Sequence, residues 1–318
     1  MKLLIALVVG VAGACLLAPS AANAQATRTW VSGLGDDANP CSRTAPCKTI
    51  AGAYSKTAAS GEINCIDAGG YGAVTISKAL AIKCDNTEAG VLVAGTNAIV
   101  VTAGSTDAVW LSGIDFEGLG PTSTSLNGIK FITGGSLTVE NCVIRGFGNT
   151  NGTDGNGIFF NPTSGTPKLF VDNTVITDNA NVAVEVKPAI GAGANAKISN
   201  TRVANNTTGF RSNASGGASS VNVDVIDSVA SFSSGAGIKA QGGTNGAQVM
   251  INHTNVSFNG TGVGADGANT FARIGYSTIT GNVNATSSTN SGQVLSYNNN
   301  QLNGNVNDLP LPTTIPLH

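Results

Sequence analysis

The sequence predicts an all-β chain wound into a β-solenoid of about ten coils, with a short helix closing its N-terminal end. Three observations predict this class: a repeat of short strands, an excess of glycine and a shortage of charge. The 318 residues include 42 glycines, while only 11% are charged and 5% are aromatic. No Gly-X-Y period runs through the chain, which excludes collagen, and 41% apolar residues exclude a disordered chain.

The repeat is the pattern apolar-x-polar-x-x-apolar, as in Val139 to Ile144 and Val171 to Ile176. Its closing residues recur every 23 to 32 residues, at Phe116, Ile144, Ile176, Val203, Ala230, Val256, Ile279 and Leu302. A second apolar position follows glycine or alanine, at Ile129, Ile158, Val184, Phe210, Ile238 and Val263. A third comes later, at Leu137, Leu169, Ile198, Val221, Val249, Phe271 and Val294. Three short strands per repeat, without helical periodicity, fit one coil.

Glycine and asparagine mark the corners between the predicted strands. Both tolerate the left-handed backbone conformation that sharp corners require. Asn141, Asn173 and Asn200 occupy the same corner of successive repeats, so we expect them to form a hydrogen-bonded ladder. The alternative is that they are ordinary turn residues with no ladder.

The first 24 residues have the order of a secretory signal peptide. Lys2 precedes an apolar run from Leu3 to Leu17, and Ala22-Asn23-Ala24 supplies the cleavage site. We therefore expect the mature chain to be secreted, periplasmic or at the cell surface. A lipoprotein with Cys15 as the modified residue is an alternative. No later segment has membrane-spanning length, and 16 basic against 18 acidic residues leave no basic face for nucleic acid.

Export permits disulfides, and five cysteines follow the signal segment. Cys41 and Cys47 close a short loop around Pro46. Cys65 and Cys84 follow Ile63 and Ile82 at the same offset, which predicts equivalent neighbouring strands at a separation that suits a disulfide. Cys142 is then a buried free thiol.

Residues 25–60 form an N-terminal cap segment, residues 61–307 the solenoid, and residues 308–318 a proline-rich tail. Ile50, Ala53, Tyr54 and Thr57 have helical spacing and would cover the open end of the first coil.

Three motifs carry a resemblance over roughly residues 27 to 305. They are Val-Ser-x-x-Gly-x-Asp-x-Asn-Pro from Val31, Pro-x-Lys-Thr-Ile-x-x-Ala from Pro46, and Gly-x-Ile followed by Gly-x-Tyr from Gly61. In these motifs the chain resembles secreted right-handed parallel β-helix proteins of the pectin-lyase-like superfamily. The resemblance implies that fold. It does not select an activity, because the superfamily includes pectate lyases, polygalacturonases, alginate-modifying enzymes and phage tailspikes.

One outward column on the glycine-led strands combines charge with an aromatic ring. Strand alternation places the residues after the inward positions on the surface, as Lys130, Phe159, Glu185, Arg211, Lys239 and Gly264. The cations suit sugar carboxylates and the ring suits stacking on a sugar. For a uronide lyase, Glu185, Arg211 and Lys239 are the catalytic candidates. The alternative is a solvated surface on which Glu185 and Arg211 pair.

Other chemistry finds less support in the sequence. The repeats lack the Asp-Asp, Gly-His-Gly and Arg-x-Lys segments of polygalacturonases. Asp36, Asp37 and Asn39 gather oxygens that suit calcium, and Glu140 and Asp172 on adjacent coils suit a shared cation. No Cys/His cluster suggests zinc. His253 falls at the asparagine corner, where a structural role is expected.

The sequence thus predicts an extracytoplasmic protein that interacts with polysaccharide or a cell-surface glycan without catalysis. The alternatives are a uronide lyase acting through the outward column, and a purely structural or adhesive solenoid.

Overall fold

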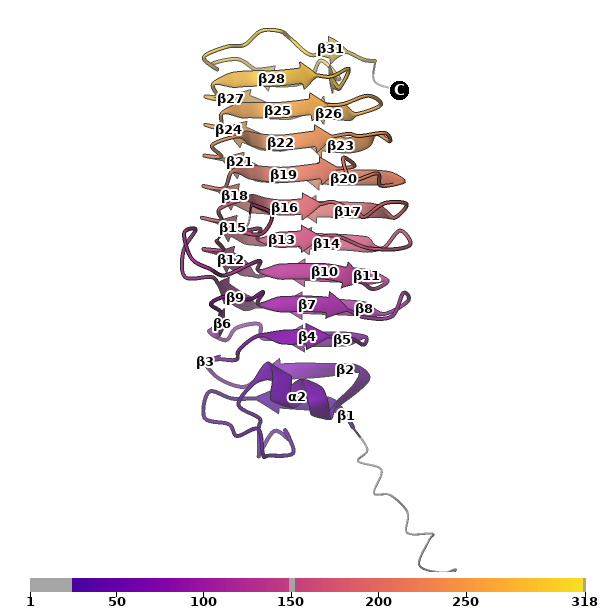
Figure 1. Ribbon diagram of the computed structural model, residues 1–318. Helices are drawn as coiled ribbons and strands as arrows, with labels where there is room; N and C mark the ends of the chain where they lie inside the picture. Colours follow the sequence, from indigo (N-terminus) through magenta and orange to yellow (C-terminus); the bar gives the residue numbers. More distant parts are fainter. Residues whose placement is uncertain (1–24, 149–151, 317–318) are drawn as a thin grey trace, which may run out of the picture.

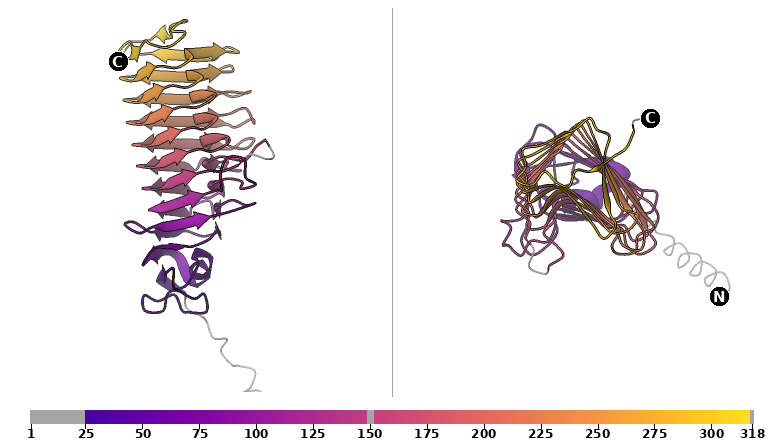
Figure 2. Two further views of the ribbon diagram at one scale, coloured as in Figure 1. Left: turned by 90° about the vertical axis from the view of Figure 1, so that its left-hand side faces the viewer. Right: turned by 90° about the horizontal axis from the view of Figure 1, so that it is seen from above.

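The computed structural model describes residues 25–148 and 152–316. Within them the chain winds as a right-handed parallel β-helix, and each coil passes through three sheets (Figure 1). Viewed along the axis, the sheets form the sides of a prism (Figure 2). The predicted signal peptide, residues 1–24, lies outside the described residues. We number the sheets in the order in which a coil crosses them.

All pairings between named strands in the three sheets are parallel. Sheet 1 contains β4 (Val74–Ile76), β7 (Ile99–Thr102), β10 (Ile129–Thr133), β13 (Ile158–Phe160), β16 (Val182–Val186), β19 (Thr208–Asn213), β22 (Ala236–Gln241), β25 (Thr261–Asp266) and β28 (Asn284–Thr289). Sheet 2 contains β1 (Ala26–Val31), β2 (Thr57–Cys65), β5 (Leu80–Lys83), β8 (Ala108–Ser112), β11 (Ser136–Glu140), β14 (Lys168–Asp172), β17 (Gly193–Ser199), β20 (Ser220–Ile226), β23 (Ala247–Asn252), β26 (Phe271–Gly275), β29 (Gln293–Ser296) and β31 (Thr313–Thr314). Sheet 3 contains β3 (Gly69–Gly70), β6 (Ala89–Leu92), β9 (Ile114–Glu117), β12 (Val143–Arg145), β15 (Val175–Thr177), β18 (Arg202–Ala204), β21 (Val229–Ser231), β24 (Asn255–Ser257), β27 (Thr278–Thr280) and β30 (Gln301–Leu302).

The predicted solenoid is confirmed. Each strand of the 9-stranded sheet 1 leads into one strand of sheet 2 and one of sheet 3 in the described residues. The closing residues of the repeat are direct neighbours in sheet 3, beginning with Phe116, Ile144 and Ile176. These residues are completely buried. The apolar residues therefore form columns along the axis, and each coil covers the core of the next.

The third apolar position was predicted in the wrong register at three places. In sheet 2, Leu169 lies beside Ala196 rather than Ile198, and Val249 lies beside Val223 rather than Val221. Ala272, not Phe271, continues this column. Sheet 2 strands have more than one inward position, and alanine is too weakly apolar to mark the correct one by composition.

The N-terminal cap combines a helix with a strand. Thr49 begins helix α2 (Ile50–Lys56) by accepting a hydrogen bond from the backbone N–H of Gly52, and Ile50 and Ala53 are buried. This confirms the predicted helix. The cap also supplies β1, which pairs with β2 and begins sheet 2. Strand β2 starts at Thr57, four residues before the predicted start of the solenoid.

The proline-rich tail lies against the last coil. The carbonyl of Asn307 accepts a hydrogen bond from the N–H of Ala285, and the carbonyl of Pro310 accepts one from the Thr286 hydroxyl. Strand β31 then pairs with β29. The tail therefore covers the C-terminal end, a role that its composition did not suggest.

Both predicted disulfides are present, Cys41–Cys47 and Cys65–Cys84, with Cα separations of 4.7 Å and 4.8 Å. The second joins neighbouring strand ends, because Ile63 and Ile82 are partners in sheet 2. Both bonds are consistent with an extracellular location. No helix in the described ranges has the length and apolar character needed to cross a membrane.

Cys142 is free and buried, as predicted. Burial raises the pKa of its thiol to about 12. Because the thiolate is the reactive form, we expect native Cys142 to resist alkylation at pH near 8 and to react once urea unfolds the chain. Mass spectrometry after timed labelling measures this. Rapid labelling of the native protein would contradict the buried placement.

The corner ladder is only partly as predicted. Asn173 donates to the side-chain oxygen of Asn141 at 2.8 Å, but Asn200 donates to Asp172 at 2.9 Å instead. All three asparagines are in the left-handed conformation. The Asp172 carboxylate, which the sequence suggested could share a cation with Glu140, thus accepts hydrogen bonds from the side chains of Asn200 and Ser199.

A longer, buried asparagine ladder lies at the next corner, between sheets 3 and 1, and the sequence prediction missed it. It is made by Asn179, Asn206, Asn259, Asn282 and Asn305, with Ser233 at one rung. Each asparagine side-chain oxygen accepts from the backbone of the preceding coil, as in Asn259 N–H to Asn282 at 2.9 Å. The Ser233 hydroxyl is buried without a hydrogen-bond partner, so the ladder is interrupted at that rung. The ladder thereby satisfies backbone groups inside the protein.

Candidate functional site

The predicted outward column exists in register on sheet 1. Pairings run from Lys130 to Phe159, then to Glu185, Arg211 and Lys239, and end at Gly264. The inward partners, such as Ile129 and Phe210, are completely buried. The strand alternation of sheet 1 therefore aligns the five side chains along the axis, one per coil, at about 4.8 Å spacing.

Glu185 is buried although it points outward. Its side chain is 2% exposed, against 22% for Arg211. Arg211 Nε donates to one carboxylate oxygen, and Asn213 Nδ2 donates to the other at 2.7 Å. Both oxygens are thus engaged by the protein. The pair predicted between Glu185 and Arg211 forms, but it does not lie on a solvated surface.

Arg211 and Lys239 line a groove of about 260 Å³ across the C-terminal coils of sheet 1. Its other lining residues are Thr208, Gly235, Ala236, Thr261, Gly264, Ala265, Asp266, Ser287 and Thr289. Gly264 leaves the floor open, because a Cβ there would meet no atom closer than Lys239 Cγ at 3.7 Å. The groove thus has two cations, small residues and hydroxyl groups.

Asp266 holds the ammonium of Lys239, with Lys239 Nζ 3.2 Å from Asp266 Oδ2. Hydrogen bonds from Asn290, Lys239 and Thr289 hold the pKa of Asp266 below its ordinary value, although partial burial acts in the opposite direction. Asp266 therefore stays ionised at neutral pH and fixes the position of Lys239.

The lowered pKa of Asp266 predicts a dependence of stability on pH. Its ordinary value is 3.8, so its contribution is present above that value and is lost as the pH falls below it. Thermal unfolding of Asp266→Asn should show a smaller decline on acidification than that of the wild-type protein. Equal declines would contradict this assignment.

Lys130 and Phe159 lie on the same face but do not line this groove. Lys130 Nζ is 5.7 Å from the centre of the Phe159 ring and 4.0 Å from Asp154 Oδ1. The structure therefore brings together Arg211 and Lys239 and leaves the other two predicted ligand-binding residues at a separate place on the column.

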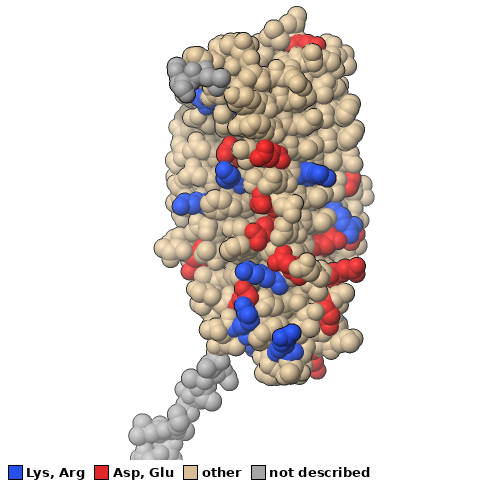
Figure 3. All heavy atoms as spheres, turned by 180° about the vertical axis from the view of Figure 1, so that it is seen from behind, with Lys and Arg blue, Asp and Glu red and all other residues tan. Residues whose placement is uncertain are grey.

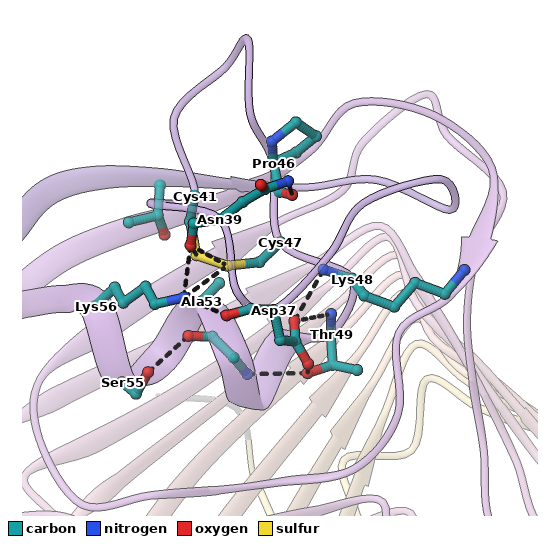
Figure 4. The surroundings of a disulfide bond; sticks show 12 residues. Asp37, Asn39, Cys41, Pro46, Cys47, Lys48, Thr49, Ala53, Ser55 and Lys56 are labelled. Atoms are coloured by element: carbon teal, nitrogen blue, oxygen red, sulfur yellow. Dashed lines mark hydrogen bonds between the residues drawn. A yellow bond between two sulfur atoms is a disulfide. The ribbon is translucent and has the colours of Figure 1, made fainter.

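The loop expected to suit calcium has protein partners for its oxygens (Figure 4). The backbone carbonyls of Asp37 and Asn39 accept from Lys56 Nζ. The carboxylate of Asp37 accepts from the backbone N–H groups of Lys48 and Thr49, each at 2.9 Å. Partial burial raises the pKa of Asp37, but these hydrogen bonds outweigh it and the pKa lies below its ordinary value.

The Lys56 ammonium thus contacts the backbone carbonyls of two of the three residues that the sequence suggested for a cation. Asp36 accepts from the backbone of Ala38 within the same loop. No group of three or more His, Cys, Asp or Glu side chains suited to a metal occurs in the residues that the structure describes. His253 lies at the expected corner and stacks on Tyr276 with ring centres 5.2 Å apart.

Comparisons with known proteins identify the fold. No known family profile matches the chain, and no curated protein matches it. Among solved structures, pectate lyase Pel9A matches with a TM-score of 0.52 and 16% identity, over 85% of this chain and 67% of that one. This chain therefore shares the parallel β-helix fold of that pectate lyase.

Proposed function

We propose that this protein binds an acidic polysaccharide outside the cytoplasm through the groove on sheet 1, without cleaving it. The observation that carries the proposal is the pair of cations, Arg211 and Lys239, on adjacent coils of one groove. A polyuronide presents carboxylates at regular intervals along an extended chain. A groove with cations in axial succession suits such a ligand, and the fold shared with a pectate lyase supports a carbohydrate-related role.

Arg211 is held ready for a carboxylate. Its Nε is bound to Glu185, while its terminal nitrogens donate to no other residue in the described ranges. The planar guanidinium can therefore direct these nitrogens at a sugar carboxylate in a two-point contact. Glu185 is accordingly a positioning residue for the binding cation.

The same geometry favours binding over catalysis. A general base must come within hydrogen-bond reach of the proton that it removes. Glu185 is buried and both its oxygens are engaged. Uronide lyase activity is the second candidate, favoured by the fold and by Lys239, which is the remaining titratable column residue on the groove. If incubation with polygalacturonate or alginate releases an unsaturated product, seen by its ultraviolet absorbance, the protein is a lyase.

Binding is tested with Lys239→Met and Gly264→Trp, measured by isothermal titration against polygalacturonate and alginate. Each variant should weaken binding by about tenfold or more, through lost charge or a filled groove. Lys197→Met is the matched control, because Lys197 pairs with Asp224 at 3.8 Å on sheet 2. Wild-type affinity in both groove variants would refute the proposal. Failure of the wild-type protein to bind either polymer would also refute it and would favour a purely structural role.

A further inference from the structure

The outer face of sheet 3 carries two hollows larger than the groove on sheet 1. The first, of about 670 Å³, crosses β3, β6, β9 and β12, and the second, of about 400 Å³, crosses β15, β18 and β21. They abut, because Val175 of the second is the direct sheet neighbour of Val143 of the first. Together they follow the solenoid axis along the corner between sheets 2 and 3.

Small residues make this groove deep and asparagines make its wall. Gly70 and Gly90 leave the floor without side chains in the first coils, since a Cβ at either would meet no atom closer than 3.7 Å. Asn141, Asn173 and Asn200 stand at the corner on one side, one per coil. The wall therefore presents amide groups at the repeat distance of the coils, about 4.8 Å.

An aromatic stack continues the same corner column beyond the second hollow. After Asp227 the corner positions are His253 and Tyr276, whose rings are nearly parallel at 9°. Both side chains are exposed, Tyr276 by 56%. An apolar ring surface at the end of an amide-lined groove is a typical feature of sugar recognition, because sugars offer hydroxyl edges and C–H faces.

The charges of this groove do not favour a polyanion. Glu88, Asp115 and Asp227 line the hollows with one lining cation, Arg202, among the residues that the structure describes, and Arg145 at the edge is already paired with Asp115 at 3.0 Å. Strands β21, β24, β27 and β30 contain no charged residue. Figure 3 shows that charged side chains on the rear face also become fewer toward the C-terminal end. A long, hydroxyl-rich ligand without charge fits these features.

We propose that the groove on sheet 3 is a second, independent binding site, for an extended uncharged polysaccharide chain that runs along the solenoid axis. The two sites have opposite charge character, since the sheet 1 groove offers cations and the sheet 3 groove offers amides, apolar side chains and a net excess of acids. The protein then binds a neutral and an acidic glycan at once, on different sides of the prism.

The test uses the full mature chain with one blocking variant for each groove. Gly90→Trp fills the sheet 3 groove, and a Cβ at Gly90 meets no atom closer than Gly69 O at 3.7 Å. Gly264→Trp fills only the sheet 1 groove. Probes are soluble uncharged β-glucan, xylan and galactomannan, with polygalacturonate as the acidic comparison, and circular dichroism checks that both variants fold.

We expect wild-type protein to bind at least one uncharged probe, Gly90→Trp to bind it about tenfold more weakly or worse, and Gly264→Trp to bind it normally. Polygalacturonate should give the reverse pattern. Absence of any uncharged ligand, or normal binding by Gly90→Trp, would overturn this proposal while leaving the acidic site standing. If Gly264→Trp loses binding to polygalacturonate and keeps binding to the uncharged probe, that result supports the first proposal independently of the second.

A second pair of variants tests the aromatic stack. Tyr276→Asn keeps a residue that tolerates the left-handed corner, where Tyr276 has φ 48°. Phe258→Asn is the matched control, since Phe258 has φ 59°, is 58% exposed and stacks on Phe232 at the opposite corner of sheet 3. Weaker binding of the uncharged probe by Tyr276→Asn alone supports the stated path of the chain; equal effects of both variants would contradict it.

Discussion

Replacing Arg211 with leucine is expected to lower the free energy of unfolding by about 3 kcal/mol, because it leaves a buried carboxylate without its cation. The Glu185 side chain is 2% exposed, and Asn213 would be its remaining partner. The single variant therefore retains a charge that water cannot reach. Urea unfolding followed by circular dichroism measures the loss.

The double variant Glu185→Leu, Arg211→Leu should recover most of that stability, since it removes the charge as well as its partner. Arg145→Leu is the control. Arg145 bridges Asp115 and Glu117, but all three are 38–41% exposed, so its loss should cost under about 1 kcal/mol. If Arg211→Leu is no worse than Arg145→Leu, Glu185 is hydrated. This dependence is why the binding test above leaves Arg211 unchanged.

Replacing Asn259 with alanine should also destabilise the protein by about 3 kcal/mol, since several buried polar groups lose their partners together. Asn259 Nδ2 donates to the carbonyls of Ala230 and Ser257, and its side-chain oxygen accepts from the N–H of Ser233. These groups lie inside the solenoid, where water does not replace the amide.

Asn222→Ala is the matched control, because Asn222 also forms a rung with an asparagine, Asn195, but on the exposed face of sheet 2. Its replacement should change the free energy of unfolding by less than about 0.5 kcal/mol. Similar losses in the two variants would mean that the interior ladder contributes no more than a surface hydrogen bond.

The coils, the corners and the outward column could be predicted because each follows from a short-range rule. Strand alternation predicts that the column from Lys130 to Lys239 lies on one face. The tolerance of asparagine for the left-handed conformation predicts that Asn141 and Asn173 lie at corners. The burial of Glu185 could not be predicted in this way. It depends on Arg211 and Asn213 from the next coil, so it needs the three-dimensional arrangement of two coils.

The interior ladder did leave a signal in the sequence. Its residues fall three positions after the closing apolar residues, as Asn206 follows Val203, Asn259 follows Val256 and Asn282 follows Ile279. An alignment of the repeats at this offset would have found it. Asparagine is so common at the exposed corners that composition alone does not distinguish a buried rung. The two grooves that we propose as binding sites, on sheets 1 and 3, could be found only in the coordinates, since glycine floors have no sequence signature of their own.

The C-terminal tail has a consequence for how far the stack can grow. A coil whose upper edge is bare offers unpaired backbone groups in parallel register, and another molecule could add its own strand there. Because β31 pairs with β29 and Asn307 bridges to Asn284, the edge of the last coil is covered by residues 307–314. The tail thereby leaves fewer unpaired backbone groups at the edge where a strand of another molecule would have to pair to extend the stack into a fibre.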